Sequence, residues 1–313
     1  MSSNRPDPNR QKPSQNRRFP KSDPIGQLSP GARRVVWVIL LGVVWAVSHF
    51  FPSEQPTSKS TSAVSDRPIQ AVQLKADPQA KLIQTEFQSC PQHFPDSVPP
   101  KVIEQPRLRE LCYEGFAVLH SGQTKTPVFV AQRLDREQIE RARTIPRTDD
   151  FFEEPRLPRD DRSQLTDYRR SGYSRGHMAP AGDMGTAKSK AQSFSLANIV
   201  PQDRLHNGQA WEEVESNTRK YLERAKGDVF VLTGPVFDKS PETIGANQVA
   251  VPTYLFKVVY DAGNGHSWVH WHENRADTRT ESPISYETFV ERTGLRFLPE
   301  SALKTFSGQP AAQ

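Results

Sequence analysis

Two stretches of the chain decide its fold: residues 174–180 read SRGHMAP, and residues 198–219 read NIVPQDRLHNGQAWEEVESNTR. The second stretch carries Asn207, Glu215 and Arg219 at multiples of four residues. On a continuous α-helix a step of four turns only about 40° around the axis, so this spacing predicts the three side chains along one edge of a helix. The alternative is an ordinary amphipathic helix with solvated charges and Asn207 as its N-cap.

Strand-like and helical runs flank these stretches on both sides. In chain order, the sequence predicts a hairpin of strand-like runs at 115–122 and 127–134, a short helix at 136–143 inside a charged excursion, a helix at 211–225, and strands at 228–237 and 249–261. This order of elements predicts an α+β domain with a largely antiparallel central sheet.

Several side chains in the two stretches offer the chemistry of phosphodiester hydrolysis. That reaction needs a base to activate water, a cation to neutralise developing charge, and donors for the phosphate oxygens. His177 can be the base near neutral pH, and Asn207 can offer a hard oxygen to Mg²⁺. Arg175 and Arg219 can hold phosphate.

The blocks of residues in this region resemble the DNA/RNA non-specific endonuclease family of ββα-metal, endonuclease G-like nucleases. The resemblance covers roughly Gly115 to Leu298, and its blocks follow the family's order. They are Arg-Gly-His at 175–177, Asn-Ile-x-Pro-Gln at 198–202, Asn-x-x-Ala-Trp-x-x-x-Glu at 207–215, the following Arg219, Thr-Gly-Pro at 233–235 and Val-Pro-Thr at 251–253. Ser174 stands where the family motif has Asp, which puts the orientation of His177 in question.

The resemblance implies a ββα-metal fold and a role for each site residue. It implies His177 as the general base, Asn207 as the one direct protein ligand of a single Mg²⁺, Glu215 as a holder of water on that ion, Arg175 and Arg219 as phosphate contacts, and Asn198 as an orienting residue. Mn²⁺ is the alternative ion.

The activity that the resemblance implies is sequence-non-specific cleavage of DNA and RNA to 5′-phosphate ends, with a homodimer as the assembly that family members often form. Two other functions compete with it. One is a catalytically impaired, nuclease-like module that binds nucleic acid at a membrane. The other is a membrane-tethered scaffold whose tail binds a cytoplasmic partner.

Charge is distributed unevenly along the chain. Residues 1–34 hold eight basic and two acidic side chains, a net charge of +6, whereas the remainder holds 33 basic and 34 acidic side chains, a net charge of −1. Bulk charge is therefore no sign of nucleic-acid binding, and a phosphate-binding surface has to come from local clusters. Because residues 1–34 are polar and rich in Pro, we expect a disordered, basic cytoplasmic tail.

An apolar run follows this tail, VVWVILLGVVWAVSHFF at residues 35–51. At about 1.5 Å per residue it is just long enough to cross a hydrocarbon core, which predicts one transmembrane helix. The positive charge before it places the folded part on the periplasmic side of a bacterial inner membrane. A cleaved signal peptide and a buried core helix are the alternatives, and the bulky Phe50-Phe51-Pro52 after the run disfavours cleavage.

The rest of the chain divides by composition. Residues 52–85 are rich in Ser, Thr and Pro and are expected to form a flexible linker, followed by a nuclease domain at 86–307 and a disordered tail at 308–313. Cys90 and Cys112 are the only cysteines of the sequence. An oxidising compartment favours a disulfide between them, with two buried free thiols as the alternative.

Overall fold

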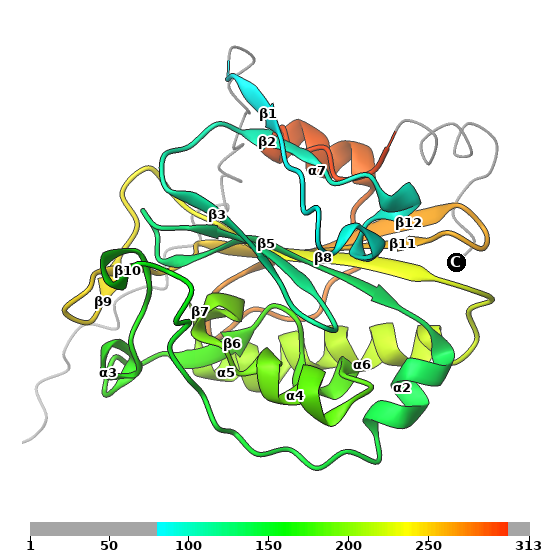
Figure 1. Cartoon of the computed structure of the whole chain (residues 1–313), viewed down its shortest axis with the longest axis horizontal. Helices are drawn as coiled ribbons and strands as arrows, with labels where there is room; N and C mark the ends of the chain where they lie inside the picture. The colour runs from blue at the N-terminus through cyan, green and yellow to red at the C-terminus, as the bar shows by residue number, and fades with distance from the viewer. Residues whose placement is uncertain (1–79, 300–313) are drawn as a thin grey trace, which may run out of the picture. The chain divides into compact units, whose positions relative to one another are not determined.

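A six-stranded antiparallel sheet forms the middle layer of the folded part of the chain (Figure 1). A computed structural model describes residues 80–299. The strand order is β12-β11-β8-β5-β4-β3, so each strand lies next to the one that precedes or follows it in the sheet's own set of strands. The strands are β3 (Leu108–Cys112), β4 (Ala117–Ser121), β5 (Thr126–Leu134), β8 (Val229–Val236), β11 (Tyr254–Asp261) and β12 (His266–Glu273). The predicted α+β class with an antiparallel sheet is confirmed.

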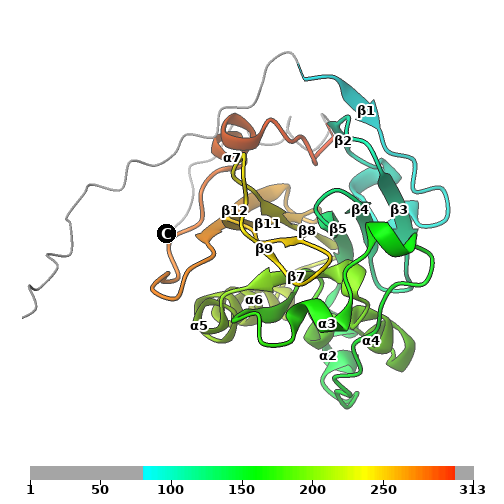
Figure 2. The ribbon, with the colours of Figure 1, turned by 90° about the vertical axis from the view of Figure 1, so that its left-hand side faces the viewer.

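One face of the sheet is covered by the segment that carries the candidate site. Figures 1 and 2 both show the helices of this segment below the sheet. These elements are α2 (Arg136–Ala142), η3 (Arg159–Asp161), α3 (Leu165–Tyr168), β6 (Ser174–His177), η4 (Ala181–Asp183), α4 (Ala187–Ser193), η5 (Leu196–Asn198), β7 (Ile199–Gln202), α5 (Arg204–Gly208) and α6 (Ala210–Leu222).

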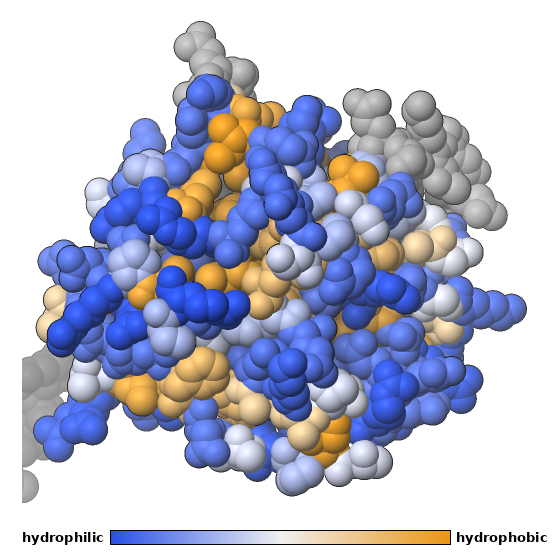
Figure 3. All heavy atoms as spheres, in the orientation of Figure 1, coloured by the Kyte–Doolittle hydropathy of each residue, from blue (hydrophilic) through white to orange (hydrophobic). Residues whose placement is uncertain are grey.

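The opposite face packs against the two ends of the described chain. Its elements are β1 (Leu82–Gln84), η1 (Pro91–His93), η2 (Pro95–Ser97), β2 (Lys101–Ile103) and α7 (Tyr286–Thr293). The core between these layers is aromatic: the Phe256 ring lies 5.0 Å from Phe289, and the Phe129 ring lies 5.3 Å from Phe297. On the outer surface seen in Figure 3, hydrophobic side chains occur in small groups among hydrophilic ones.

The central strands are buried on both faces, and this explains their nearly continuous apolar sequences. Polar side chains interrupt that pattern in one row beneath α6. In this row Lys257 of β11 pairs with Thr233 of β8 on one side and with His270 of β12 on the other. All three residues are buried, and a buried charge is rare unless it is paired. The row therefore points to the α6 side of the sheet as the functional side.

Several predicted elements are confirmed with small shifts in their ends. The hairpin is formed by β4 and β5, the short helix is α2, and the strand at 228–237 is β8. The strand expected at 249–261 is wrong as a single element, because it divides into β10 (Val249–Ala250), which pairs with β9 (Thr243–Ile244), and β11. Pro252 lies in the gap, where it cannot donate a ladder hydrogen bond.

The predicted tail at 1–34, the anchor at 35–51 and the C-terminal segment 308–313 lie outside the described residues. Residues 80–299 contain no helix that is both long enough and apolar enough to span a membrane. β1 belongs to the last residues of the segment expected as a linker, and it pairs with β2.

The predicted disulfide is confirmed: Cys90 and Cys112 are bonded, with their Cα atoms 5.7 Å apart. The bond ties η1 to the end of β3. Cys90 is buried in the aromatic core together with Phe87 and Phe94, so the bridge closes a short loop over that core.

Replacing both cysteines by alanine should lower the free energy of unfolding by about 3 kcal/mol, because the unfolded chain loses a cross-link over 22 residues. For a domain of this size that corresponds to a fall in Tm of roughly 6–12 °C. Calorimetry of the full-length chain would measure it. Dithiothreitol should reproduce the fall in the wild type and leave the double variant unchanged; equal Tm values for both proteins would contradict the prediction.

Candidate active site

The small antiparallel sheet of β6 and β7 presents Arg175 and His177, and α5 and α6 follow it in a β-β-α order. Arg175 lies opposite Pro201 and His177 opposite Ile199. Gly176 between them lies against Gln202, where an added Cβ would come within 2.1 Å of the Gln202 side-chain oxygen. Only glycine therefore allows this close pairing. Ser174, at the position of the family's Asp, starts β6 opposite Gln202.

His177 is buried between two aromatic rings. Its ring centre lies 5.3 Å from that of Phe151 and 5.2 Å from that of Phe194. Burial, with smaller contributions from Arg147 and Arg175, lowers the pKa of His177 to about 3. The imidazole is therefore neutral at pH 7, which is the protonation state that a general base needs. Its Nε2 atom has no hydrogen-bond partner within residues 80–299.

Asn198 holds the turn that follows His177. Its Oδ1 accepts a hydrogen bond from the Ala179 N–H at 2.8 Å, and its Nδ2 donates to the carbonyls of Ala179 and Ser193 at 2.9 Å each. The side chain is fully buried, and these bonds occupy both ends of its amide. This geometry suits the orienting role implied by the family resemblance and leaves Asn198 out of contact with substrate.

Asn207 is not on one continuous helix with Glu215, so that part of the sequence interpretation is wrong. The helix breaks at Gln209, whose backbone has φ −129° and ψ −90°. The N-cap alternative is wrong as well. Asp203 caps α5 by accepting from the N–H groups of Leu205 and His206, and Gln209 occupies the N-cap position of α6. The break follows a glycine, which weakens a helix at that point.

The Asn207 amide is half-buried and has no hydrogen-bond partner among the described residues. The helix α5 that carries Asn207 packs against β6, the strand of His177. An amide oxygen is a hard ligand suited to Mg²⁺ among waters, so Asn207 fits the role of a single protein ligand. In the described range, no group of three or more His, Cys, Asp or Glu side chains forms a metal-binding cluster.

Glu215 and Arg219 of α6 lie close to Asp183, a buried acidic residue in the turn after His177. Arg219 Nη1 lies 3.2 Å from Asp183 Oδ1 and 3.9 Å from Glu215 Oε2. Lys257, reaching from the sheet, donates to the Thr233 hydroxyl at 3.0 Å and is almost fully buried. Two acids and two bases thus meet at the inner face of α6.

Burial raises the pKa of Glu215 to about 7, and nearby Asp183 adds to this rise. Lys257 and Arg219 act in the opposite direction. A carboxyl group with a pKa near 7 changes its charge within the physiological range, which is common at functional sites.

Four residues around the site were not anticipated from the sequence: Arg147, Phe151, Asp183 and Lys257. Arg147 lies over the Phe194 ring at 5.3 Å, and Arg175 lies over the Phe151 ring at 4.0 Å. The segment that carries Arg147 and Phe151 has no helical or strand period, so no local signal marked it. Lys257 did leave a signal, because it is the one basic residue in the otherwise apolar run YLFKVVY.

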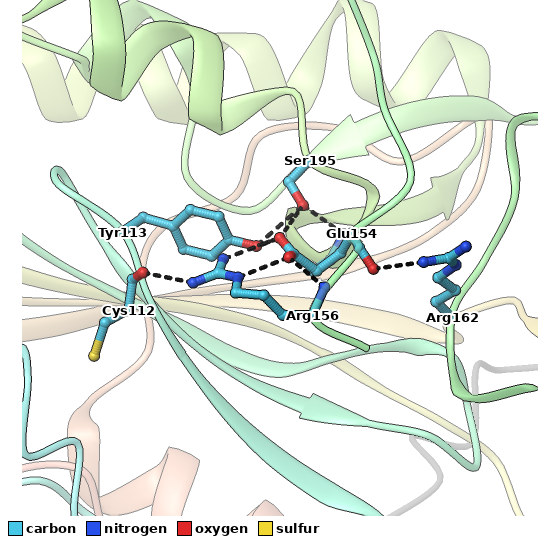
Figure 4. A network of polar contacts seen from close by, with 7 residues as sticks. Cys112, Tyr113, Glu154, Arg156, Arg162 and Ser195 are labelled. Carbon is cyan, nitrogen blue, oxygen red and sulfur yellow. Dashed lines mark hydrogen bonds and ion pairs between the residues drawn. The ribbon is translucent and has the colours of Figure 1, made fainter. Parts of the chain in front are cut away.

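A buried polar network fixes the segment next to Phe151 (Figure 4). Glu154 accepts hydrogen bonds from Arg156 at 2.7 Å and from Ser195 at 3.1 Å, and it also accepts from the Tyr113 hydroxyl. Arg156 in turn donates to the Cys112 carbonyl at 3.0 Å. Burial alone would raise the pKa of Glu154, but the hydrogen bonds from Arg156 and Tyr113 lower it to about 2. The network connects the disulfide strand to the neighbourhood of His177.

Comparison with known proteins agrees with this geometry. Residues 99–302, more than half of the chain, match the sequence model of the DNA/RNA non-specific endonuclease family. The chain belongs to that family. The resemblance predicted from its motifs is confirmed.

Relatives in this endonuclease family are nucleases by name. The chain is 36% identical to the mitochondrial nuclease EXOG of Danio rerio over 154 residues, which is 45% of this chain and 44% of that protein. It is 33% identical to the mitochondrial endonuclease G of Homo sapiens over 164 residues, 49% of this chain and 54% of that protein. It is 32% identical to nuclease C1 of Cunninghamella echinulata var. echinulata over 158 residues, 47% of this chain and 62% of that protein. The chain spans about half the length of the curated relatives it matches.

The fold of the endonuclease family is also seen in a solved structure. A crystal structure of an EndoG/EndoGI complex, concerned with how EndoG is inhibited, matches with a TM-score of 0.56 and 28% identity. The match covers 62% of this chain and 86% of that chain. The α+β architecture with an antiparallel sheet is therefore common to both.

The family resemblance implies that Glu215 holds water on the metal, so the pKa of Glu215 predicts how the expected cleavage at limiting Mg²⁺ would depend on pH. Because its folded-state pKa is raised, the carboxyl is protonated below about pH 7 and ionised above it, so the rate should rise roughly tenfold per unit below that midpoint. His177 does not titrate in this range, since its pKa is about 3.

Rate profiles between roughly pH 5 and pH 9 would test this, with Glu215→Gln as the variant that cannot ionise. The exposed Glu137 of α2 offers a matched control, and Glu137→Gln should keep the wild-type profile. A midpoint at the ordinary pKa of a glutamate would contradict the prediction.

Proposed function

We propose that this chain hydrolyses phosphodiester bonds of DNA and RNA with little sequence preference, using one Mg²⁺-type ion. The observation that carries the proposal is that α5, which carries the unpartnered Asn207 amide, packs against β6, which carries the buried His177. A proton acceptor and a hard oxygen ligand are the two groups that hydrolysis of a phosphodiester requires first. Membership of the endonuclease family supports the same reading.

The proposed reaction gives each protein group of the site one role. His177 takes a proton from water while the water oxygen forms a bond to phosphorus, and the bond from phosphorus to the 3′ oxygen of the leaving nucleotide breaks. Arg175, exposed on β6, can contact the phosphate. Arg219 is held in place by Asp183, and because 22% of its side chain is exposed it can also contact the phosphate.

The metal supplies one kind of chemistry: when bound, Mg²⁺ would be held by Asn207 and would stabilise the charge that develops on the phosphate oxygens. Glu215 can accept hydrogen bonds from water beside Asn207 once its carboxyl is ionised. Mn²⁺ has the same preference for oxygen ligands and could replace Mg²⁺.

The arginines of the site support the proposed substrate class. Arginines and a cation recognise the phosphate backbone, which carries no sequence information, and the backbone phosphate is common to DNA and RNA. The competing function, a nucleic-acid-binding module without catalysis, would keep binding and lack turnover. A homodimer remains a prediction from the family resemblance.

Replacing His177 by alanine should lower the rate of plasmid and RNA cleavage roughly 10²–10⁴-fold, the range that a general base supplies. DNA binding should change little, whereas Tm should fall, because removal of a ring buried between Phe151 and Phe194 leaves a cavity. His266→Ala, at an exposed position at the start of β12, is the matched control and should cleave as the wild type does.

A rate within about tenfold of the wild type would remove His177 from the role of base. Binding without cleavage by the wild type at every tested concentration of Mg²⁺ and Mn²⁺ would favour the binding module instead.

We also propose that residues 35–51 anchor the chain in a bacterial inner membrane, with the nuclease domain on the periplasmic side. The charge of +6 before the apolar run supports this orientation, and the Cys90–Cys112 disulfide suits an oxidising compartment.

Protease added to spheroplasts should digest the domain and leave the N-terminal tail protected. Digestion of the tail alone would reverse the topology, and a soluble, shortened domain would indicate a cleaved signal peptide.

A further inference from the structure

The helix that carries Asn207 cannot hold its own position. α5 has only five residues, Arg204–Gly208, and a helix of this length is unstable unless other parts of the fold fix it. A metal ligand placed on such a turn depends on whatever anchors the turn. In this structure the anchor comes from β12 and the residue after it, about 70 residues later in the chain.

Asn274 makes the central contact of this anchor. Its Oδ1 accepts from the Asp203 N–H at 2.8 Å, and its Nδ2 donates to the Pro201 carbonyl at 3.1 Å and to the Pro252 carbonyl at 3.0 Å. The side chain is buried, with 8% of Asn274 exposed. One carboxamide therefore joins the end of β7, the N-cap of α5 and the approach to β11.

Asp203 connects Asn274 to α5 through its own hydrogen bonds. Its Oδ1 accepts from the Leu205 N–H at 2.9 Å and from the His206 N–H at 3.0 Å. Its carbonyl accepts from the Asn207 N–H at 2.9 Å. Asn274 thus fixes the one residue that both caps the helix and bonds the backbone of the proposed ligand.

His272 holds the same helix from its buried side. The His206 and His272 rings meet through Nε2 and Nδ1 at 3.2 Å, and Gln202 Nε2 lies 3.2 Å from His206 Nδ1. Since the Gln202 amide donates, His206 Nδ1 accepts, and its Nε2–H donates to His272 Nδ1. This chain fixes the ring of His206, the neighbour of Asn207.

We propose that Asn274, together with His272, is a positioning residue for the metal site, holding α5 so that the Asn207 amide faces the bound cation. The inference rests on the proposed function, because it takes Asn207 as the ligand. Neither residue touches the cation or the substrate. Their effect is on the geometry of a ligand, and outer contacts of this kind commonly change metal affinity 10–100-fold.

The affinity of the full-length chain for Mn²⁺ tests this proposal directly. It is measured without nucleic acid, from the loss of the EPR signal of the free ion. Asn274→Ala should weaken binding about tenfold, the lower end of that range. His272→Phe should also weaken it, since the aromatic ring next to Trp211 is kept and only the bond to His206 is lost. If Asn274→Ala does not fold, His272→Phe decides the matter.

Tyr286→Phe is the matched control for a loss of buried hydrogen bonds. The Tyr286 hydroxyl accepts from the N–H groups of Phe297 and Leu298 at 2.7 and 2.9 Å on the opposite face of the sheet. This variant should lower Tm and leave Mn²⁺ binding unchanged. Asn207→Ala is the reference variant: it gives the Mn²⁺ affinity that remains when the proposed ligand is removed.

The outcomes separate the two proposals. Weaker binding in Asn207→Ala but wild-type binding in Asn274→Ala and His272→Phe would overturn the positioning role and leave the proposed metal site intact. Wild-type binding in Asn207→Ala would overturn the metal site itself, and the positioning role with it.

Discussion

The placement of Trp211 is the constraint on which the rest of the site depends. Its side chain is almost fully buried in the first turn of α6. Its ring lies 5.7 Å from His206 of α5, 5.7 Å from His272 of β12 and 5.6 Å from the Lys257 ammonium of β11. An aromatic side chain of this size buries a large area and tolerates little displacement. Once it is seated, the axis of α6 is fixed over the sheet, and the positions of Glu215 and Arg219 follow.

Burial then sets the protonation of the site. It holds His177 neutral by lowering its pKa and moves the pKa of Glu215 up to the neutral range. Both shifts have one cause, since a low-dielectric surrounding penalises the charged form of either group. Arg219 and Lys257 limit the effect on Glu215. Because the pKa of Glu215 is near 7, a phosphate and a cation bound at the site can change the charge of its carboxyl group.

Hydrogen bonds between residues far apart in the sequence hold the two halves of the site in place. On one side, Glu154 bonds Arg156, Tyr113 and Ser195 and so steadies the chain next to Phe151 and His177. On the other side, Asn274 holds the N-cap of α5. Buried, fully hydrogen-bonded groups such as these specify one arrangement because any alternative leaves polar atoms unpaired. Catalytic groups placed on short elements gain their precision from such contacts.

The sequence by itself determined the elements with a strong local period and the motif residues of the family. The β4–β5 hairpin, the strand β8 and the residues His177, Asn207 and Glu215 were all found this way. Only the tertiary structure decided the helix break at Gln209, the division at Pro252, and the contacts of Asp183 and Asn274. A break depends on backbone angles that neighbouring packing selects, and the hydrogen bond between the N-cap of α5 and Asn274, the residue after β12, joins residues about 70 positions apart. Neither leaves a periodic trace along the chain, because periodicity records only which face of an element is buried.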